Sequence, residues 1–136
     1  MATSGLITVK SRFSVAETID RLADIVLGAG LLVFARIDHG ANASKIGAPL
    51  RPTELLIFGN PKGGTPLMQD RQISGIDLPV KALAWEDGEG IVWLSCNDAH
   101  WIAERHGLGE PSKNAVAAIA AGMQKVIAAA AGTDLP

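Results

Sequence analysis

Two apolar runs separated by a short Gly-rich segment constrain the fold of this chain more than any other feature. The runs are Val80 to Glu86 and Ile91 to Asn97, with Asp87-Gly88-Glu89-Gly90 between them. Runs of this length joined by a short turn that contains glycine are typical of a β-hairpin. We therefore expect an antiparallel sheet, because parallel strands need a long crossover between them.

The two tryptophans of this hairpin depend on the loop for their positions. If the loop were Gly88 and Glu89 alone, Trp85 and Trp93 would lie on opposite faces of the sheet. A three-residue loop that ends at Gly90 in the left-handed conformation places them directly opposite each other. We expect the second register, because it separates large side chains from the small ones that alternate with them.

This register leaves one face of the sheet rich in tryptophan and the other rich in alanine. The alanine face, with Ala82 and Ala84, suits close packing of the Ala-rich last helix. The tryptophan face would then have no helix of its own, and monomers rarely expose so large an apolar patch. The pattern predicts a homodimer in which a two-fold axis buries this face against a second copy.

Two long helices are predicted, one near each end of the chain. The first follows the capping box Ser14-Val15-Ala16-Glu17, repeats apolar residues at helical spacing, and ends at Gly28 and Gly30. The last begins after Ser112, which we expect to be its N-cap, and carries an apolar stripe from Val116 to Ala130.

The remaining strands and short helices complete the predicted order β-α-β-β-β-β-α. We expect both long helices on one face of an antiparallel sheet, which is an α+β fold. The other strands are predicted at Leu6–Ser11, Leu31–Asp38 and Thr53–Phe58. Shorter elements are a loop or short helix over His39 to Gly47, a Gly/Pro turn over Asn60 to Gly64, a helix from Thr65-Pro66, and a helix over Ala99 to His106 closed by Gly107.

Composition limits the classes of protein to consider. The chain has 136 residues, of which 48% are hydrophobic, so it fits a single domain over residues 1–136 with one core. Its net charge is −2, and its basic residues are spread singly, so we expect no nucleic-acid partner.

No signal peptide is recognised, and the segment Ala115 to Ala131 is mostly alanine, so no membrane partner is expected. Together with a single cysteine, Cys96, these features predict a cytoplasmic protein.

Several stretches together resemble the family catalogued as domain of unknown function 302, from Gly5 to about His106. That resemblance implies an α+β fold like the TATA-binding-protein class and a tendency to dimerise, and it implies no activity. The stretches are Ala35 to His39, Leu50 to Lys62 followed by Gly64 to Met68, Asp77 to Lys81 running into Trp85-Glu86-Asp87, Trp93 to Ser95, and Asn97-Asp98.

One group of candidate site residues lies in and around two neighbouring strands. Asp38 and His39 stand at a strand end, where Asp38 could orient the histidine, although the same residues suit a turn. Glu54 lies inside the most apolar strand, and a buried carboxylate needs a partner such as Arg36 or Arg51. A structural ion pair is the favoured interpretation, and an acid/base or ligand-binding group is the alternative.

A second group lies in the Gly-rich segment after Phe58. The spacing of Gly64, Thr65 and Lys62 does not match a Walker loop, because lysine comes before the second glycine. A strand, a turn and a helix N-terminus can still hold an anion, with Asn60, Lys62 and Thr65 as candidates and a plain turn as the simpler interpretation. We expect no metal and no cofactor, because His100 and His106 are six residues apart and Cys96 reads as a core residue.

These patterns favour a homodimeric domain that binds a small, partly anionic or apolar molecule. The candidate ligand-binding residues are Arg36, Asp38, His39, Arg51, Glu54, Asn60, Lys62 and Thr65. One alternative is a hydrolase or isomerase that uses Glu54 or the Asp38–His39 pair, which would require these groups to converge on one cleft. The other is a structural or protein-binding dimer without a ligand.

Overall fold

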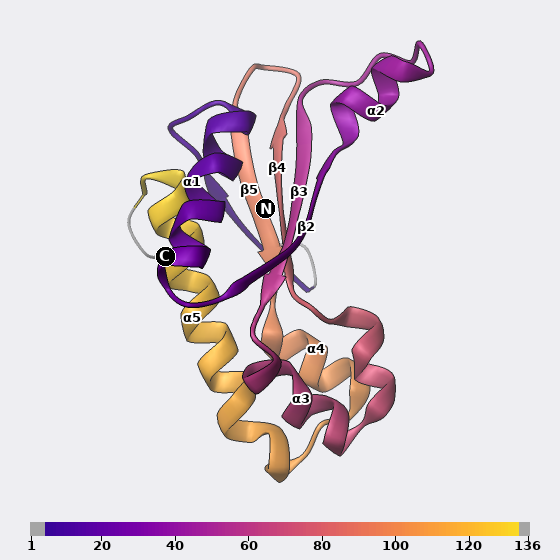
Figure 1. Cartoon of the computed structure of the whole chain (residues 1–136), viewed down its shortest axis with the longest axis vertical. Helices are drawn as coiled ribbons and strands as arrows, with labels where there is room; N and C mark the ends of the chain where they lie inside the picture. Colours follow the sequence, from indigo (N-terminus) through magenta and orange to yellow (C-terminus); the bar gives the residue numbers. More distant parts are fainter. Residues whose placement is uncertain (1–4, 134–136) are drawn as a thin grey trace.

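The computed structural model describes residues 5–133, which form one five-stranded antiparallel sheet covered on one face by two long helices (Figure 1). The strands are β1 (Leu6–Lys10), β2 (Leu32–Asp38), β3 (Thr53–Gly59), β4 (Lys81–Glu86) and β5 (Val92–Asn97), in the spatial order β1-β5-β4-β3-β2. The fold class and the order of the main elements are as the sequence predicts.

The long helices α1 (Val15–Gly28) and α5 (Lys113–Ala131) lie on the same face of the sheet. Helix α1 packs over β3 and β4, and α5 packs over β1 and β5. The helix that covers Ala82 and Ala84 is therefore mainly α1, whereas we expected α5. The largest side chains of the core come from both layers, and they include Ile19, Leu22, Leu56, Phe58, Leu94 and Ile127.

The hairpin of β4 and β5 has the predicted register. Trp85 pairs directly with Trp93, and Gly90 has a φ of 79°, the left-handed conformation that the three-residue loop requires. Asp87 closes the loop by accepting hydrogen bonds from the backbone N–H groups of Glu89 and Ile91. The sheet therefore presents its small residues to the helices and its tryptophans to the opposite face.

Helix α3 (Pro61–Asp70) begins five residues earlier than predicted, at Pro61 rather than at Pro66. The segment expected to be a Gly/Pro turn is its first turn, because Asn60 is the N-cap and its Oδ1 accepts a hydrogen bond from Lys62 N at 3.0 Å. Proline is favoured directly after such a cap, where its missing N–H is not needed. The Thr65-Pro66 pair, which resembled a helix start, lies inside the helix instead.

Short helices complete the chain, and the sequence predicted some of them but not the two 3₁₀ helices. Helix α2 (His39–Lys45) follows β2, a 3₁₀ helix, η1 (Gln72–Asp77), precedes β4, and α4 (Ala99–His106) ends at Gly107 as predicted. A second 3₁₀ turn, η2 (Glu110–Ser112), leads into α5. Ser112 is the N-cap residue of α5, as predicted, but its side chain makes no capping hydrogen bond. Its hydroxyl donates instead to Asp70 Oδ2 at 2.7 Å and ties η2 to α3.

The segment Glu110–Ala131 is long and apolar enough to cross a membrane by length and composition alone. The alanine content of Ala115 to Ala131 therefore does not by itself exclude a membrane span, contrary to the expectation from the sequence. In this fold the apolar face of the segment packs against α1 and the sheet, and the core helix of a soluble protein meets the same criterion.

Candidate functional site

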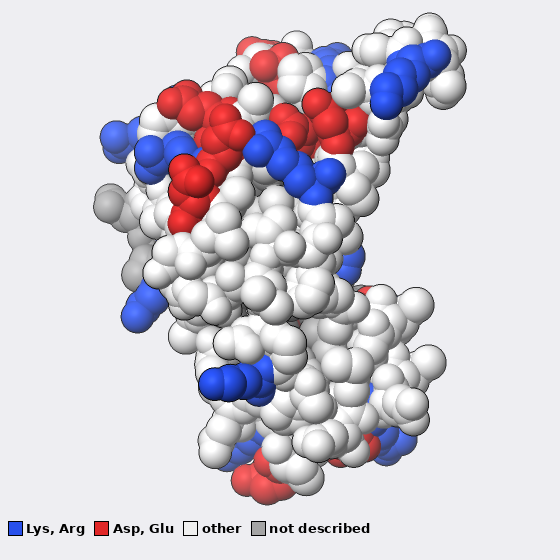
Figure 2. Space-filling view, in the orientation of Figure 1, with Lys and Arg blue, Asp and Glu red and all other residues white. Residues whose placement is uncertain are grey.

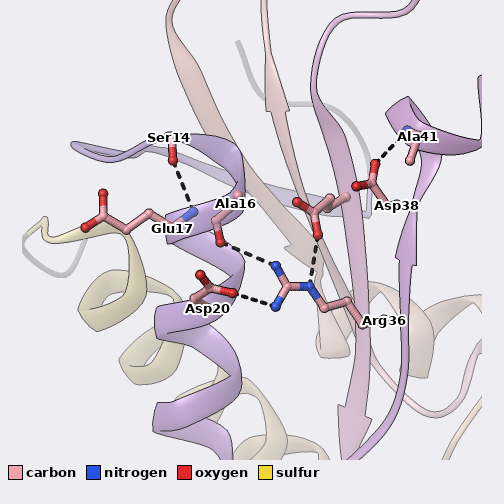
Figure 3. Close-up of polar contacts among 8 residues, drawn as sticks. Ser14, Ala16, Glu17, Asp20, Arg36, Asp38 and Ala41 are labelled. Carbon is pink, nitrogen blue, oxygen red and sulfur yellow. Dashed lines mark hydrogen bonds and ion pairs between the residues drawn. The ribbon is translucent and has the colours of Figure 1, made fainter. Parts of the chain in front are cut away.

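The candidate residues of β2 and β3 form a bridge between the sheet and α1. Arg36 donates from Nε to Glu54 Oε1 at 2.9 Å, from Nη1 to Asp20 Oδ1 at 2.6 Å, and from Nη2 to the carbonyl of Ala16. Figure 3 shows the guanidinium between the two elements. Burial lowers the pKa of Arg36, but the hydrogen bonds to Asp20 and Glu54 outweigh it and hold that pKa above its ordinary value.

The predicted burial and pairing of Glu54 are confirmed. Glu54 is 7% exposed, and its partner is Arg36, one of the two arginines expected. The cross-strand register brings the pair together, because Arg36 and Glu54 project from neighbouring strands toward the helices. This arrangement supports the structural interpretation of Glu54, since its carboxylate is occupied by a fixed cation.

Asp38, His39 and Arg51 lie near this bridge at the same end of the sheet. Asp38 Oδ1 accepts a hydrogen bond from Ala41 N at 2.8 Å, so this carboxylate is the N-cap of α2 (Figure 3). His39 is the first residue of α2, and Arg51 lies beside Gly88 of the hairpin loop. The side chain of Asp38 thus contacts the helix backbone, and the structure gives it no hydrogen bond to His39 among the described residues.

The second group of candidates lines a cavity at the other end of β3. Glu54 and Asn60 are six positions apart along the chain, which is about 20 Å of extended strand, so the two groups do not face a common space. The cavity has a volume of 450 Å³ and lies between α3, α5 and the ends of β3 and β2. Asn60, Lys62 and Thr65 contribute to it.

Apolar side chains and glycines form most of the cavity wall. Helix α5 contributes one face, on which the lining residues recur at helical spacing. The lining residues that sequence reasoning did not single out for a site are Leu31, Phe34, Phe58, Gly59, Pro61, Gly63, Gly64, Met68, Leu78, Pro79, Val80, Ala118, Ile119, Gly122, Met123 and Val126. Such a lining is typical of small-molecule pockets, and its volume lies in their usual range.

Two glycines determine how open this cavity is. A Cβ atom at Gly63 of α3 would lie 3.6 Å from Cγ1 of Ile119, so the two helices approach closely there. A Cβ atom at Gly122 of α5 would meet no other atom within 4 Å, so the space beside it is open. An isolated glycine inside an apolar helical stripe was the one signal in the sequence that could have pointed to this cavity.

The mouth of the cavity carries positive charge. Lys62 lies there exposed, no ion pair of the described residues uses it, and the first turn of α3 has no acidic residue. The backbone N–H groups of that turn are occupied, because Lys62 N donates to the Asn60 side chain, and Gly63 N and Gly64 N donate to the Asn60 carbonyl. An anionic group would therefore meet the Lys62 ammonium rather than a ring of free amides.

Figure 2 shows how charge is distributed around this region. Charged side chains gather at the upper and lower ends of the molecule, and the surface between them is mostly uncharged apart from scattered basic side chains. In residues 5–133 the structure forms no group of three or more His, Cys, Asp or Glu side chains that could hold a metal ion.

Cys96 is buried on β5, and burial, with a smaller effect of Asp98, raises the pKa of its thiol to about 12. At pH 8 the thiolate is then about a thousandfold scarcer than for an ordinary thiol. We expect the native protein to react with Ellman's reagent at least about a thousandfold more slowly than the unfolded chain. Labelling with and without guanidinium measures this ratio, and equal rates would contradict the buried position.

Comparison with known proteins gives a family and a fold. The family model described as domain of unknown function DUF302 matches residues 7–130. A crystal structure of an uncharacterized conserved protein DUF302 from Bacillus stearothermophilus has a TM-score of 0.74, covers 96% of this chain and 98% of that chain, and is 21% identical. At this identity the likeness shows the fold alone.

Longer curated relatives come from Brucella. Proteins named fluoride-specific ion channel FluC 1 from Brucella suis and Brucella abortus are each 56% identical over 129 residues, which is 95% of this chain. A protein named fluoride-specific ion channel FluC 2 from Brucella melitensis matches equally. The matched segment is 51%, 48% and 48% of their lengths, so the chain spans about half of these relatives.

Proposed function

We propose that this chain, which belongs to the family called domain of unknown function DUF302, is a homodimeric domain that binds a small apolar molecule with an anionic group. The observation that carries the proposal is the 450 Å³ cavity between α3 and α5. Its apolar wall suits the body of the ligand. Lys62 at its mouth suits a carboxylate or a similar anion.

Medium-chain carboxylates fit this description, and decanoate is a suitable probe. The alkyl chain would replace water along Phe58, Met123 and the other apolar lining residues, which is favourable by about 0.8 kcal/mol for each buried CH₂ group. The carboxylate would stay at the mouth beside Lys62. We expect decanoate to bind more tightly than decanol, and Lys62→Met to remove that preference.

Gly122→Leu tests the location of the ligand. The new side chain enters open space in the cavity, so we expect decanoate to bind at least about tenfold more weakly, which corresponds to about 1.4 kcal/mol. Leucine also favours a helix over glycine by somewhat less than about 1 kcal/mol, so the variant should not unfold. Isothermal titration calorimetry measures the affinity, and thermal unfolding checks the fold.

Ala121→Leu is the matched control for this substitution. Ala121 is the preceding residue of α5, is exposed and does not line the cavity. We expect this variant to bind decanoate as the wild type does. If neither variant changes the affinity, or if the wild type binds neither alkyl probe, the proposed ligand site is wrong.

The homodimer is supported by the face of the sheet opposite α1 and α5. Leu55, Leu83, Trp85 and Trp93 lie there around a hollow of 620 Å³, with the two indole rings 6.4 Å apart. Both indole N–H groups are satisfied within the chain, by Ser95 Oγ at 3.0 Å and Asp87 Oδ2 at 2.8 Å. Thr8, Lys81, Ser95 and Asn97 also line this hollow, so the apolar part of the face is the patch formed by Leu6, Leu55, Leu83 and the two indole rings. Large apolar patches on a surface often mark an interface with another protein. Size-exclusion chromatography with light scattering tests the proposal, and a monomer at working concentration would refute it.

The name of the Brucella relatives suggests a second test. If the matched half of those proteins had a direct role toward fluoride, this chain would bind the ion. The cavity is a poor fit for fluoride, because its wall is apolar and the first amides of α3 are occupied. We expect sodium fluoride at millimolar concentration to leave the melting temperature where sodium chloride leaves it, whereas decanoate raises it. A shift specific to fluoride would overturn this assignment.

A further inference from the structure

The segment 39–52, here called the arm, connects β2 to β3 and has little packing of its own. No residue of α2 is buried, and beyond it Ile46 is 82% exposed and Leu50 is 52% exposed. Figure 1 shows the arm extending past the end of the sheet, away from α1 and α5. A helix of seven residues is too short to be stable without tertiary contacts. The arm therefore carries apolar side chains that stay exposed among residues 5–133, and a marginal helix that contacts β3.

We infer that the arm packs against a second copy of this chain and extends the dimer interface, an inference that rests on the proposed dimer. The first reason is area. Five strands of about six residues give the open face of the sheet about 500 Å² in projection, from a strand spacing of about 4.8 Å and a rise of about 3.3 Å per residue. A stable dimer commonly buries about 800 Å² on each partner. The exposed side chains of Ile46 and Leu50, here called the apolar tip of the arm, would add to the area that the dimer buries.

The second reason is charge. The arm carries Lys45 and Arg51 and contains no carboxylate, whereas the hairpin loop region 86–90 carries Glu86, Asp87 and Glu89 and contains no cation. Both lie at the same end of the molecule, where Arg51 already lies against Gly88 of the loop of its own chain, so Lys45 is the cation of the arm that is left for a second copy. A two-fold axis along the strands would keep both arms and both hairpins at one end of the dimer. Lys45 of each copy then lies near Glu89 of the other.

The arm can be tested by removing its apolar tip. In the double variant Ile46→Ser/Leu50→Ser, the dimer dissociation constant is expected to rise at least about tenfold in sedimentation velocity experiments. The matched control is Ile73→Ser/Ile76→Ser in η1, because these isoleucines are 69% and 70% exposed in the same chain. The control variant is expected to dimerise as the wild type does.

A charge exchange identifies the partner as a second copy. Lys45→Glu is expected to weaken the dimer, and the double variant Lys45→Glu/Glu89→Lys is expected to restore it, because each arm again meets an opposite charge. A wild-type dimer that is unchanged by the arm variants overturns this inference and leaves the proposed dimer standing. A wild-type chain that is monomeric overturns both.

Discussion

Replacement of Arg36 by methionine is expected to lower the free energy of unfolding by about 2–4 kcal/mol, because it leaves the buried carboxylate of Glu54 without a cation. Methionine keeps much of the length and apolar surface of the arginine stem. The partner of Arg36 on α1, Asp20, is mostly exposed, so Asp20→Ala should cost less than about 1 kcal/mol. Urea unfolding followed by circular dichroism measures both.

A double variant separates the loss of the ion pair from the loss of packing. In Arg36→Met/Glu54→Leu no charge is left buried, so we expect most of the lost stability to return. If Arg36→Met alone is as stable as the wild type, Glu54 is not held by Arg36. An acid/base role of Glu54 would then again be an alternative to the structural ion pair.

The second large effect is expected at the centre of the open sheet face. Leu83→Asp places a carboxylate beside Trp85 and Trp93, in surface that the proposed dimer would bury, and Lys81 lines the same hollow. Taking a carboxylate out of water costs several kcal/mol even where a cation is near, so the dimer dissociation constant should rise more than about tenfold. The isolated chain should keep its fold, because Leu83 is only half-buried there.

Leu27→Asp is the control for the added charge. Leu27 is an exposed leucine on α1, on the other side of the molecule from the open sheet face. Sedimentation equilibrium of both variants gives the comparison. A dimer that survives Leu83→Asp would place the interface elsewhere and would remove the main support for the role of the tryptophans.

The sequence predicts the sheet well because its strands are defined by local chemistry. Gly90 permits the left-handed turn that sets the register of the hairpin, so the facing of Trp85 and Trp93 follows from four loop residues. The pairing of Glu54 was also predictable, since a carboxylate in an apolar strand needs a cation nearby. These inferences depend on neighbours in sequence or in one strand pair.

The start of α3 was predicted wrongly because two caps compete in one segment. Asn60-Pro61 and Thr65-Pro66 both place a capping residue before a proline, and only the first is used. A proline inside a helix removes one hydrogen bond, which makes the earlier start the less expected of the two. What decides between them is the packing of α3 against α5 and η1, which local sequence does not contain.

The cavity could not be predicted for a related reason. Its walls come from segments as distant as Leu31 and Val126, and their relative positions follow from the whole fold. Sequence reasoning found the polar residues at its mouth but grouped them with Asp38 and Glu54. The length of β3 separates the two groups, so the candidates divide into a structural bridge at one end and a cavity at the other.

A crystal structure of the chain grown with decanoate tests the central claim most directly. We predict that the alkyl chain lies between α3 and α5 beside Gly122 and Met123. The carboxylate is predicted within about 4 Å of Lys62 Nζ, the limit for an ion pair. Decanoate bound instead on the tryptophan face, or absent from the cavity at saturating concentration, would contradict the account.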